Sequence, residues 1–432
     1  MYRIGGLFLF NRKGRKRSLL LSLSTGATAL AVVAGIVGAP GEAFRASLEG
    51  LQIWWQNVFP GLLPPLLLAE LLAASGLLHG IAAFAEPLTR GLFRLPGAAG
   101  WAIAFGWSAG IPAGAKETAR LRENGLLREN DVDTALLVSH MPNPFLVVLV
   151  IGYGFLRSPS LGWAIAFGLW TATLLTGFAW ARIAKPRAPK VPSIPLTHPV
   201  ALVQRAVRAT MDARADDGRP LGKQLADSVT NAVGTLMTLG GLMMMSAVVV
   251  RLIQLFAPGN DVWLAFPGLY EMNLGAFESS RSALFSAAPA SAAALIAAAL
   301  AWSGWSGLLQ ARAAFGNEFP FPWAKVVASR LLLSAVALFT TYGIATLALS
   351  EQASGLMTGL LPVSSAATEA WATGTPLPNG WTRLPDGIAV SLASFAVFLL
   401  LALAAAAIRP GAPKPPLKPR DEQAPSGKTP PL

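Results

Sequence analysis

The sequence predicts an all-α polytopic membrane protein with two inverted repeats of transmembrane helices, each containing a re-entrant hairpin. Apolar runs of about 20 residues, long enough to cross a hydrocarbon core of roughly 30 Å, recur along the chain. The Lys and Arg residues lie mainly in loops and tails beside these runs, where they act as topology signals. The two halves also carry similar Gly- and Ser-rich apolar segments, as expected of transporters built from inverted repeats.

The composition excludes several kinds of chemistry. The chain has no cysteine, so disulfides, thiolate metal sites and thiol nucleophiles are excluded together. Its three histidines, His79, His140 and His198, leave little material for a zinc site. The net charge of +12 gathers beside the apolar runs, which favours a lipid bilayer over nucleic acid as the partner. We therefore expect no cofactor, no metal and no nucleic acid.

The N-terminal region predicts a first span. Residues 1–17 are basic, and the positive-inside rule places them in the cytoplasm. Residues 18–39 are apolar and are predicted as the first transmembrane helix. A secretory signal is the alternative, but the run is long for one and more hydrophobic segments follow.

The predicted first repeat covers residues 51–183. Prolines interrupt its first run and prevent a straight continuous helix, because proline has no backbone donor. These prolines are Pro60, Pro64 and Pro65, within residues 51–78. Two further spans are predicted at residues 132–155 and 161–183.

A re-entrant hairpin is predicted within this repeat at residues 97–115. The segment is apolar and Gly-rich, and it runs directly into the charged stretch that begins at Lys116. If both flanks are cytoplasmic, the segment must enter and leave the bilayer on one face. Such a broken backbone is tolerated only where protein or water covers it.

A basic segment, residues 184–221, is predicted as a cytoplasmic linker between the halves. The second repeat covers residues 222–408, and residues 409–432 form a Pro-rich tail with the composition of disorder. The predicted spans of the second repeat are residues 225–256, 326–349 and 388–408. Residues 284–309 are predicted to contain the second hairpin, and a true span at residues 284–302 is the alternative. The span count places the C-terminus outside, whereas the basic tail favours the cytoplasm, so the side of the C-terminus stays open.

The two halves share a short motif that suggests two hairpin tips. The run Ala104-Phe-Gly-Trp107-Ser108-Ala is similar to Ala299-Leu-Ala-Trp302-Ser303-Gly. Free amide donors at half-helix N-termini attract anions, so both tips are candidate substrate-binding elements. Their candidate residues are Ser108, Gly110, Pro112, Gly114 and Lys116 in the first tip, and Ser303, Ser306 and Gln310 in the second. Lys116 has an alternative role as the anchor of a cytoplasmic helix.

Polar residues inside an otherwise apolar span mark another candidate site. Two prolines flank Asn143 in Ser139-His140-Met-Pro-Asn143-Pro and force a break there. Polar side chains at membrane depth are costly and indicate a pathway or site, so Ser139 and Asn143 are candidate substrate ligands. We expect His140 to be packed or hydrogen-bonded rather than a proton relay.

Two further candidate substrate ligands lie in the second half. Glu271, with Asn273 beside it, is expected either to line the outer approach or to belong to a solvated loop. Asn231 is expected either to face the same cavity or to belong to a helix cap.

A serine peptidase is the enzymatic alternative, because Gly106-Trp-Ser108-Ala-Gly110 fits a nucleophile pattern and Gly304-Trp-Ser306-Gly307 resembles that of intramembrane proteases. A serine nucleophile needs a base within hydrogen-bond reach. No histidine follows His198, and the first motif lacks the strand-turn-helix context, so we expect no enzyme. The chain also lacks a phosphate-binding loop, which makes an internal ATPase unexpected.

Several motifs together resemble the YlbJ-type family of sporulation integral membrane proteins, which carries the nucleoside recognition or Gate domain. The most specific run is Ser108 to Lys116, and the resemblance continues through Asn143-Pro144, Asp227 to Asn231 and Trp302 to Gly307. It implies a core similar to that of concentrative nucleoside transporters. It also implies a multi-pass protein of the outer forespore membrane that is needed for the spore cortex and passes dipicolinate.

The sequence therefore predicts a transporter of a small anionic or nucleoside-like substrate, most specifically a sporulation transporter for a small carboxylate such as dipicolinate. A membrane scaffold for spore cortex assembly that moves nothing is one alternative, and a nucleoside transporter is another. A homo-oligomer is compatible with the sequence.

Overall fold

The computed structural model describes residues 12–183, 199–256, 266–316 and 319–350, and within these ranges the chain forms helices and no strand. The elements, of which η1 and η3 are π-helical and η2 and η4 are 3₁₀ turns, are α1 (Arg12–Gly38), α2 (Pro40–Ile53), η1 (Trp54–Val58), α3 (Phe59–Ala74), α4 (Leu77–Phe84), α5 (Glu86–Phe93), α6 (Ala99–Ala109), α7 (Ala113–Glu123), η2 (Glu129–Asp131), α8 (Val132–Ser139), η3 (Leu146–Phe155), α9 (Pro159–Ile183), α10 (Pro199–Asp217), α11 (Leu221–Phe256), η4 (Pro267–Leu269), α12 (Met272–Arg281), α13 (Ala283–Ala287), α14 (Pro289–Trp302), α15 (Gly304–Ala314) and α16 (Trp323–Ala348). The predicted span at residues 388–408 and the predicted tail at 409–432 lie outside the described residues.

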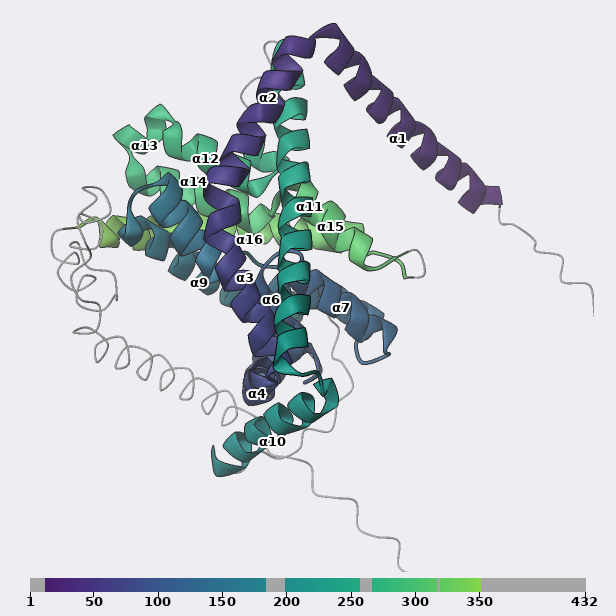
Figure 1. The fold of residues 1–432 in the computed structure, drawn as a ribbon, viewed down its shortest axis with the longest axis vertical. Coiled ribbons are helices and arrows are strands. Elements are labelled where there is room, and N and C mark those ends of the chain that lie inside the picture. Colours follow the sequence, from purple (N-terminus) through teal and green to yellow (C-terminus); the bar gives the residue numbers. More distant parts are fainter. Residues whose placement is uncertain (1–11, 184–198, 257–265, 317–318, 351–432) are drawn as a thin grey trace, which may run out of the picture.

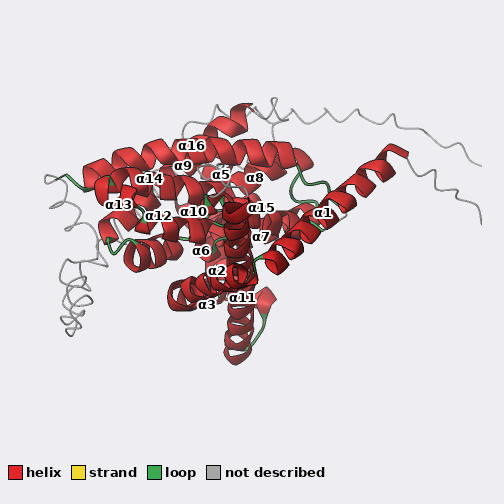
Figure 2. Cartoon of the chain, turned by 90° about the horizontal axis from the view of Figure 1, so that it is seen from above, coloured by secondary structure: helices red, strands yellow, loops and turns green. Residues whose placement is uncertain are grey.

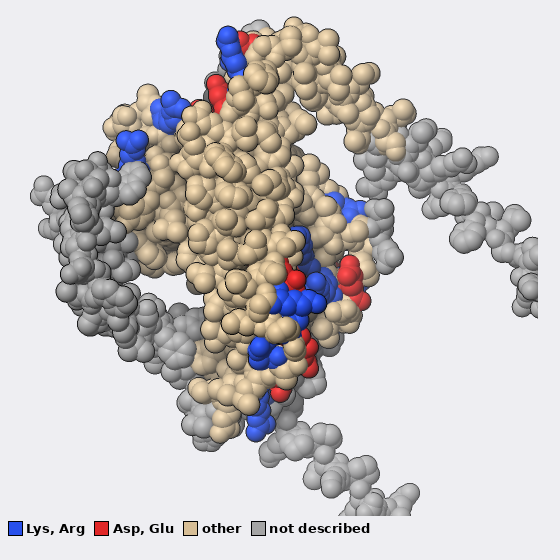
Figure 3. Space-filling view, in the orientation of Figure 1, with Lys and Arg blue, Asp and Glu red and all other residues tan. Residues whose placement is uncertain are grey.

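Helices long and apolar enough to cross a membrane confirm the prediction of a helical membrane protein. Within the described ranges there are five such stretches: Pro40–Ala74, Pro159–Ile183, Leu221–Phe256, Pro289–Ala314 and Trp323–Ala348. The predicted first span corresponds to α1, whose apolar part, Ser22–Gly38, is shorter. Large apolar side chains lie on the surface, such as Phe339 at 72% exposure, which suits lipid rather than water. Figure 3 shows a broad uncharged surface between two groups of charged side chains.

The continuous run of α2, η1 and α3 packs along α11 as a long pair (Figure 1). The contact is close because Gly50 lies against the backbone of Met244, and Gly240 lies against the ring of Trp54. The indole Nε1 of Trp54 also donates to the carbonyl of Leu236 at 2.9 Å. Small residues that allow close backbone approach are typical of helix contacts in membranes.

The prolines of the second run do not break it, contrary to the prediction. Pro64 and Pro65 lie inside α3, and Pro60 lies in its first turn. The preceding residues, Trp54–Val58, widen into a π-helix. A π-helical turn accommodates the missing donor of a nearby proline without ending the helix.

A second group of helices consists of α9, α14 and α16, which pack against one another (Figure 2). Gly168 of α9 lies directly against Thr341 of α16, where a side chain would clash. Ser334 of α16 donates to the carbonyl of Ala298 in α14 at 2.7 Å. One of the two interrupted helices described below contains α14 of this group, and the other, α8 with η3, packs against α9.

The predicted linker contains a helix that the sequence interpretation did not foresee. Helix α10 packs against α4, where the Thr210 carbonyl lies over Gly76 and the Thr210 hydroxyl lies over Gly80. Leu202 of α10 is buried against Phe84. The described part of the linker is therefore a docked helix rather than a free loop, and Figure 1 shows it at one end of the molecule.

Candidate functional site

The first predicted hairpin corresponds to α6 and α7, which fold back on each other around Gly110–Pro112. Gly110 adopts a φ of +82°, a conformation that favours glycine at this turn. Gly106 and Gly114 enclose the carbonyl oxygen of Ser139, which would lie 2.0 Å from a Cβ at either position. Both helices of the hairpin therefore pack closely against the carbonyl at the end of α8. Its re-entrant placement in a bilayer stays a prediction.

The helix that contains Asn143 is interrupted, as its two flanking prolines predicted. Helix α8 ends at Ser139, and η3 begins at Leu146. Asn143 is buried, its Oδ1 accepts from the amide of Leu146 at 2.7 Å, and its Nδ2 donates to the carbonyl of Ala109 at 3.2 Å. One side chain thus caps the second half of the broken helix and ties it to the hairpin.

A small cavity lies where the hairpin tip meets this break. Its lining includes four of the predicted substrate ligands, namely Gly110, Pro112, Asn143 and Gln310. The cavity encloses about 20 Å³, room for about one water molecule. Dipicolinate, a six-membered ring with two carboxylates, does not fit into this volume. The cavity is therefore closed to such a substrate in this arrangement of helices.

The second predicted hairpin is not confirmed. Ser303, with a φ of +70°, separates α14 from α15, which together form one apolar stretch, Pro289–Ala314, as the alternative of a true span predicted (Figure 1). The tip that packs on this break comes from residues 267–271 instead. The amide of Ser306 donates to the carbonyl of Tyr270 at 2.9 Å, and the indole of Trp302 donates to that of Leu269 at 3.1 Å. The inverted relation of the two halves stays a prediction.

Glu271 and Asn273 belong to the interior rather than to a solvated loop. Glu271 is 1% exposed, and its carboxylate accepts from the amide of Leu274 at 2.6 Å and from the side chain of Asn273 at 2.8 Å. Glu271 therefore caps α12 at its N-terminus, where a carboxylate interacts favourably with the helix dipole.

Arg330, on α16, is a buried cation that sequence reasoning missed. Its side chain is 1% exposed, and its guanidinium donates to the carbonyls of Leu136 at 2.7 Å, His140 at 2.6 Å and Ala301 at 3.3 Å. The first two carbonyls belong to the end of α8, and the third belongs to the end of α14. Arg330 thus links both helix breaks. A lone charge in an apolar span was the available signal.

Unpaired polar atoms lie at the two helix breaks that Arg330 links. Neither ring nitrogen of the buried His140 has a hydrogen-bond partner, and the hydroxyl of the buried Ser303 also has none. Both side chains flank Gly307, because a Cβ there would lie 3.2 Å from the Ser303 hydroxyl and 3.6 Å from His140 Nε2. The two groups do not hydrogen-bond each other in this structure.

Three predicted ligands lie away from this centre. Lys116 is exposed on α7, as expected of a helix anchor. The side chain of Asn231 is exposed on α11 and donates to Glu70 at 3.5 Å. Ser108 donates to the carbonyl of Ala104 in its own helix at 2.8 Å, and is therefore a helix residue rather than a free ligand.

Ser139, a predicted ligand, belongs to the hairpin contact. Its hydroxyl shares a hydrogen bond of 2.9 Å with Thr118 and donates to the carbonyl of Gly114 at 3.2 Å. Both partners are on α7. The side chain and the carbonyl of Ser139 therefore both contact the hairpin and hold it against α8.

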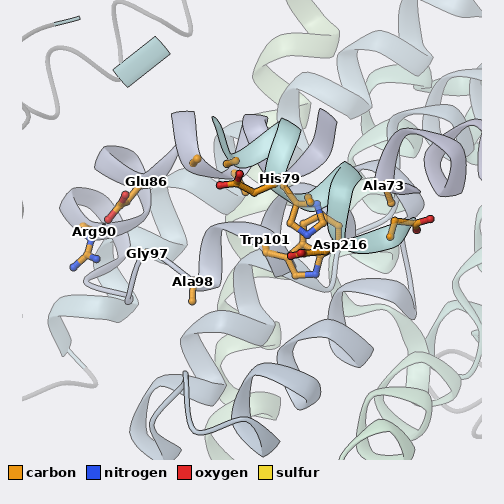
Figure 4. A pocket seen from close by; sticks show the side chains of 14 residues that line it. Ala73, His79, Glu86, Arg90, Gly97, Ala98, Trp101 and Asp216 are labelled. Carbon is orange, nitrogen blue, oxygen red and sulfur yellow. Dashed lines mark hydrogen bonds and ion pairs between the residues drawn. The ribbon is translucent and has the colours of Figure 1, made fainter. Parts of the chain in front are cut away.

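A larger pocket of about 700 Å³ opens between α10 and helices α4 to α6 (Figure 4). His79 stacks on Trp101 with a centroid separation of 3.7 Å, and the Trp101 indole donates to Glu117 at 2.7 Å. Burial lowers the pKa of His79. Glu86 pairs with Arg90 at 2.6 Å on the pocket's other side. The pocket is open and lies apart from the helix breaks.

These features define a polytopic α-helical membrane protein whose interior holds two interrupted helices and a buried cation. The chain is 34% identical over 228 residues to the sporulation integral membrane protein YlbJ of Bacillus subtilis (strain 168), across 52% of this chain and 55% of the relative. This similarity supports assignment of the chain to the YlbJ-type family of sporulation integral membrane proteins. The chain thus aligns with about half the length of that curated relative. No family model and no solved structure matches the chain.

Proposed function

We propose that this chain is a membrane transporter that moves a small carboxylate, most specifically dipicolinate, across the outer forespore membrane during sporulation. The observation that carries the proposal is the meeting of two interrupted helices inside an apolar fold, with Asn143 and Ser303 at the breaks. Interrupted helices leave backbone groups that can bind a solute, and transporters place such breaks at their substrate sites. The name of the relative, a sporulation integral membrane protein, supports the setting.

The arrangement favours transport over catalysis. Within the described residues, no group of His, Cys, Asp and Glu side chains could hold a metal ion. The hydroxyl of Ser303 and the ring of His140 lie near each other without a hydrogen bond. The closed cavity at Asn143 instead resembles a site that must open to admit its ligand. We therefore propose a non-enzymatic role.

Uptake of labelled dipicolinate into vesicles that contain the purified protein tests this function. Asn143→Leu keeps the side-chain volume but removes the contacts to Ala109 and Leu146, and we expect it to reduce uptake strongly. Asn130→Leu is the matched control, because Asn130 is exposed and remote from the breaks. Uptake by the wild-type protein no greater than that of empty vesicles would favour a scaffold for spore cortex assembly.

A further inference from the structure

The environment of Arg330 is incomplete. Among the described residues no carboxylate pairs with its guanidinium, which is held by backbone carbonyls and by a distant contact to the sulfur of Met141 at 3.9 Å. Its Nε has no partner at all. A buried cation without a counter-charge is expensive, because carbonyl dipoles replace only part of its lost hydration. The arrangement therefore calls for an anion.

The unpaired groups around Arg330 point to the same kind of ligand. They are the Nε of Arg330, both ring nitrogens of His140 and the hydroxyl of Ser303. The Nε of Arg330, one ring nitrogen of the neutral His140 and the Ser303 hydroxyl can each donate a hydrogen bond, and they come from three segments that meet at the two breaks. Three unpaired donors, one of them on a cation, fit a carboxylate, which offers four lone-pair positions and binds a guanidinium with two parallel hydrogen bonds.

We infer that Arg330 binds a carboxylate group of the transported substrate, and that this carboxylate takes the place of the backbone carbonyls of the two helix breaks. The inference rests on the proposed function and identifies the residue that selects the substrate class. Without substrate, Arg330 holds the ends of α8 and α14 together, since a cation is favourable at a helix C-terminus. When the carboxylate binds, Arg330 releases these carbonyls and the breaks can separate.

A purely structural role for Arg330 makes different predictions. A structural arginine would hold the two helix ends whatever ligand is present, and its loss would lower stability without changing which ligands bind. A substrate-binding arginine discriminates between charged and neutral ligands of the same shape. Pyridine-2,6-dicarboxamide has the shape of dipicolinate without its charge, so the pair of ligands separates the two roles.

The absence of cysteine from the chain allows a clean test. Arg330→Cys in detergent-purified protein removes the cation, and a methanethiosulfonate ethylammonium reagent restores a positive charge at that one position. We expect the variant to bind dipicolinate about 100-fold more weakly than the wild type, because it lacks the partner of a buried charge. The reagent should recover part of the affinity, and Arg330→Lys should fall between the two. Binding is measured by titration calorimetry.

Unchanged dipicolinate affinity in Arg330→Cys would overturn the inference, even if the protein transports dipicolinate. Wild-type protein that neither binds nor transports dipicolinate, but does transport a nucleoside, would overturn the proposed substrate instead. A wild-type experiment covers the case in which both variants fail to fold. Phenylglyoxal modification of Arg330, read by peptide mass spectrometry, should decrease with dipicolinate present. Equal modification with and without dipicolinate, or none in either sample, would count against the inference.

Discussion

The close contact between the hairpin and the Ser139 carbonyl predicts that an added methyl group at Gly114 destabilises the protein. Gly114→Ala adds one methyl group to α7, and its Cβ would lie 2.0 Å from the Ser139 oxygen and 2.5 Å from the Ser139 carbonyl carbon. Both atoms are backbone atoms at the end of α8, so no flexible side chain can yield. Gly234→Ala is the matched control, because a Cβ at Gly234 meets nothing within 4 Å.

The magnitude follows from the geometry. Ordinary contact begins at 3.4 Å, so the Ser139 carbonyl must retreat by about 1.4 Å. An overpacking of this size costs about 3 kcal/mol, at the upper end of the usual range. Alanine gains about 1 kcal/mol over glycine inside a helix, which leaves a net loss of about 2 kcal/mol for Gly114→Ala. Gly234→Ala keeps only the gain and should be stabilised by up to about 1 kcal/mol.

Reversible unfolding in mixed micelles, with helicity followed by circular dichroism, measures both free energies of unfolding. We also expect Gly114→Ala to lower dipicolinate uptake, because displacement of Ser139 shifts the break next to Asn143. Gly234→Ala should leave uptake unchanged. If Gly114→Ala were as stable as Gly234→Ala, the close contact between the hairpin and the Ser139 carbonyl would be contradicted, whatever the uptake.

Three further predictions address other contacts. Trp54→Phe should cost about 1 kcal/mol of unfolding free energy in the same assay, because it removes the indole donor to Leu236. No loss of stability would show that the contact between η1 and α11 does not depend on this bond. Glu271→Ala should cost about 2 kcal/mol, because it removes the cap on the amide of Leu274 and a second buried hydrogen bond; a neutral effect would contradict the buried cap. Burial lowers the pKa of His79 in the folded state, so the unfolded chain takes up its proton first. The stability that His79 contributes should be complete above about pH 6.5 and should be lost as the pH falls below that value, a dependence that His79→Gln should remove in unfolding measured between pH 8 and pH 5.

The sequence predicted those features of the fold that depend on residues next to one another in the chain. Two prolines remove backbone donors on either side of Asn143, and the Asn143 side chain can cap a new helix start, so the sequence indicated the break there. Prolines alone do not impose a break, because Pro64 and Pro65 lie inside α3. Gly110 and Pro112, between an apolar and a charged segment, indicated the turn between α6 and α7 in the same way. The π-helix before Pro60 left no comparable trace, because its residues are compatible with an ordinary α-helix.

The features that the sequence did not predict depend on contacts between distant segments. The Trp-Ser motif occurs in both halves, yet Ser108 continues a helix and Ser303 interrupts one. A short sequence similarity does not show whether the chain continues, bends or turns back at the motif. That depends on which other segment packs against the motif. For Ser303 that partner is the backbone at Tyr270. Helix α10 was missed for the same reason, because its docking on α4 gives it its role.

Arg330 shows why the site had to be read from the structure. A single arginine in an apolar run can mark the end of a span or a buried function, and its position in the sequence does not separate these cases. The structure does, because the guanidinium contacts the carbonyls of Leu136, His140 and Ala301 from two different helices. Because Asn143 follows the end of α8, motion of α8 relative to the hairpin or to α14 is one way to open the cavity at Asn143. Since Arg330 holds α8 to α14, a ligand that competes for its hydrogen bonds would weaken this link and thereby favour opening. Substrate recognition and opening would then depend on the same guanidinium.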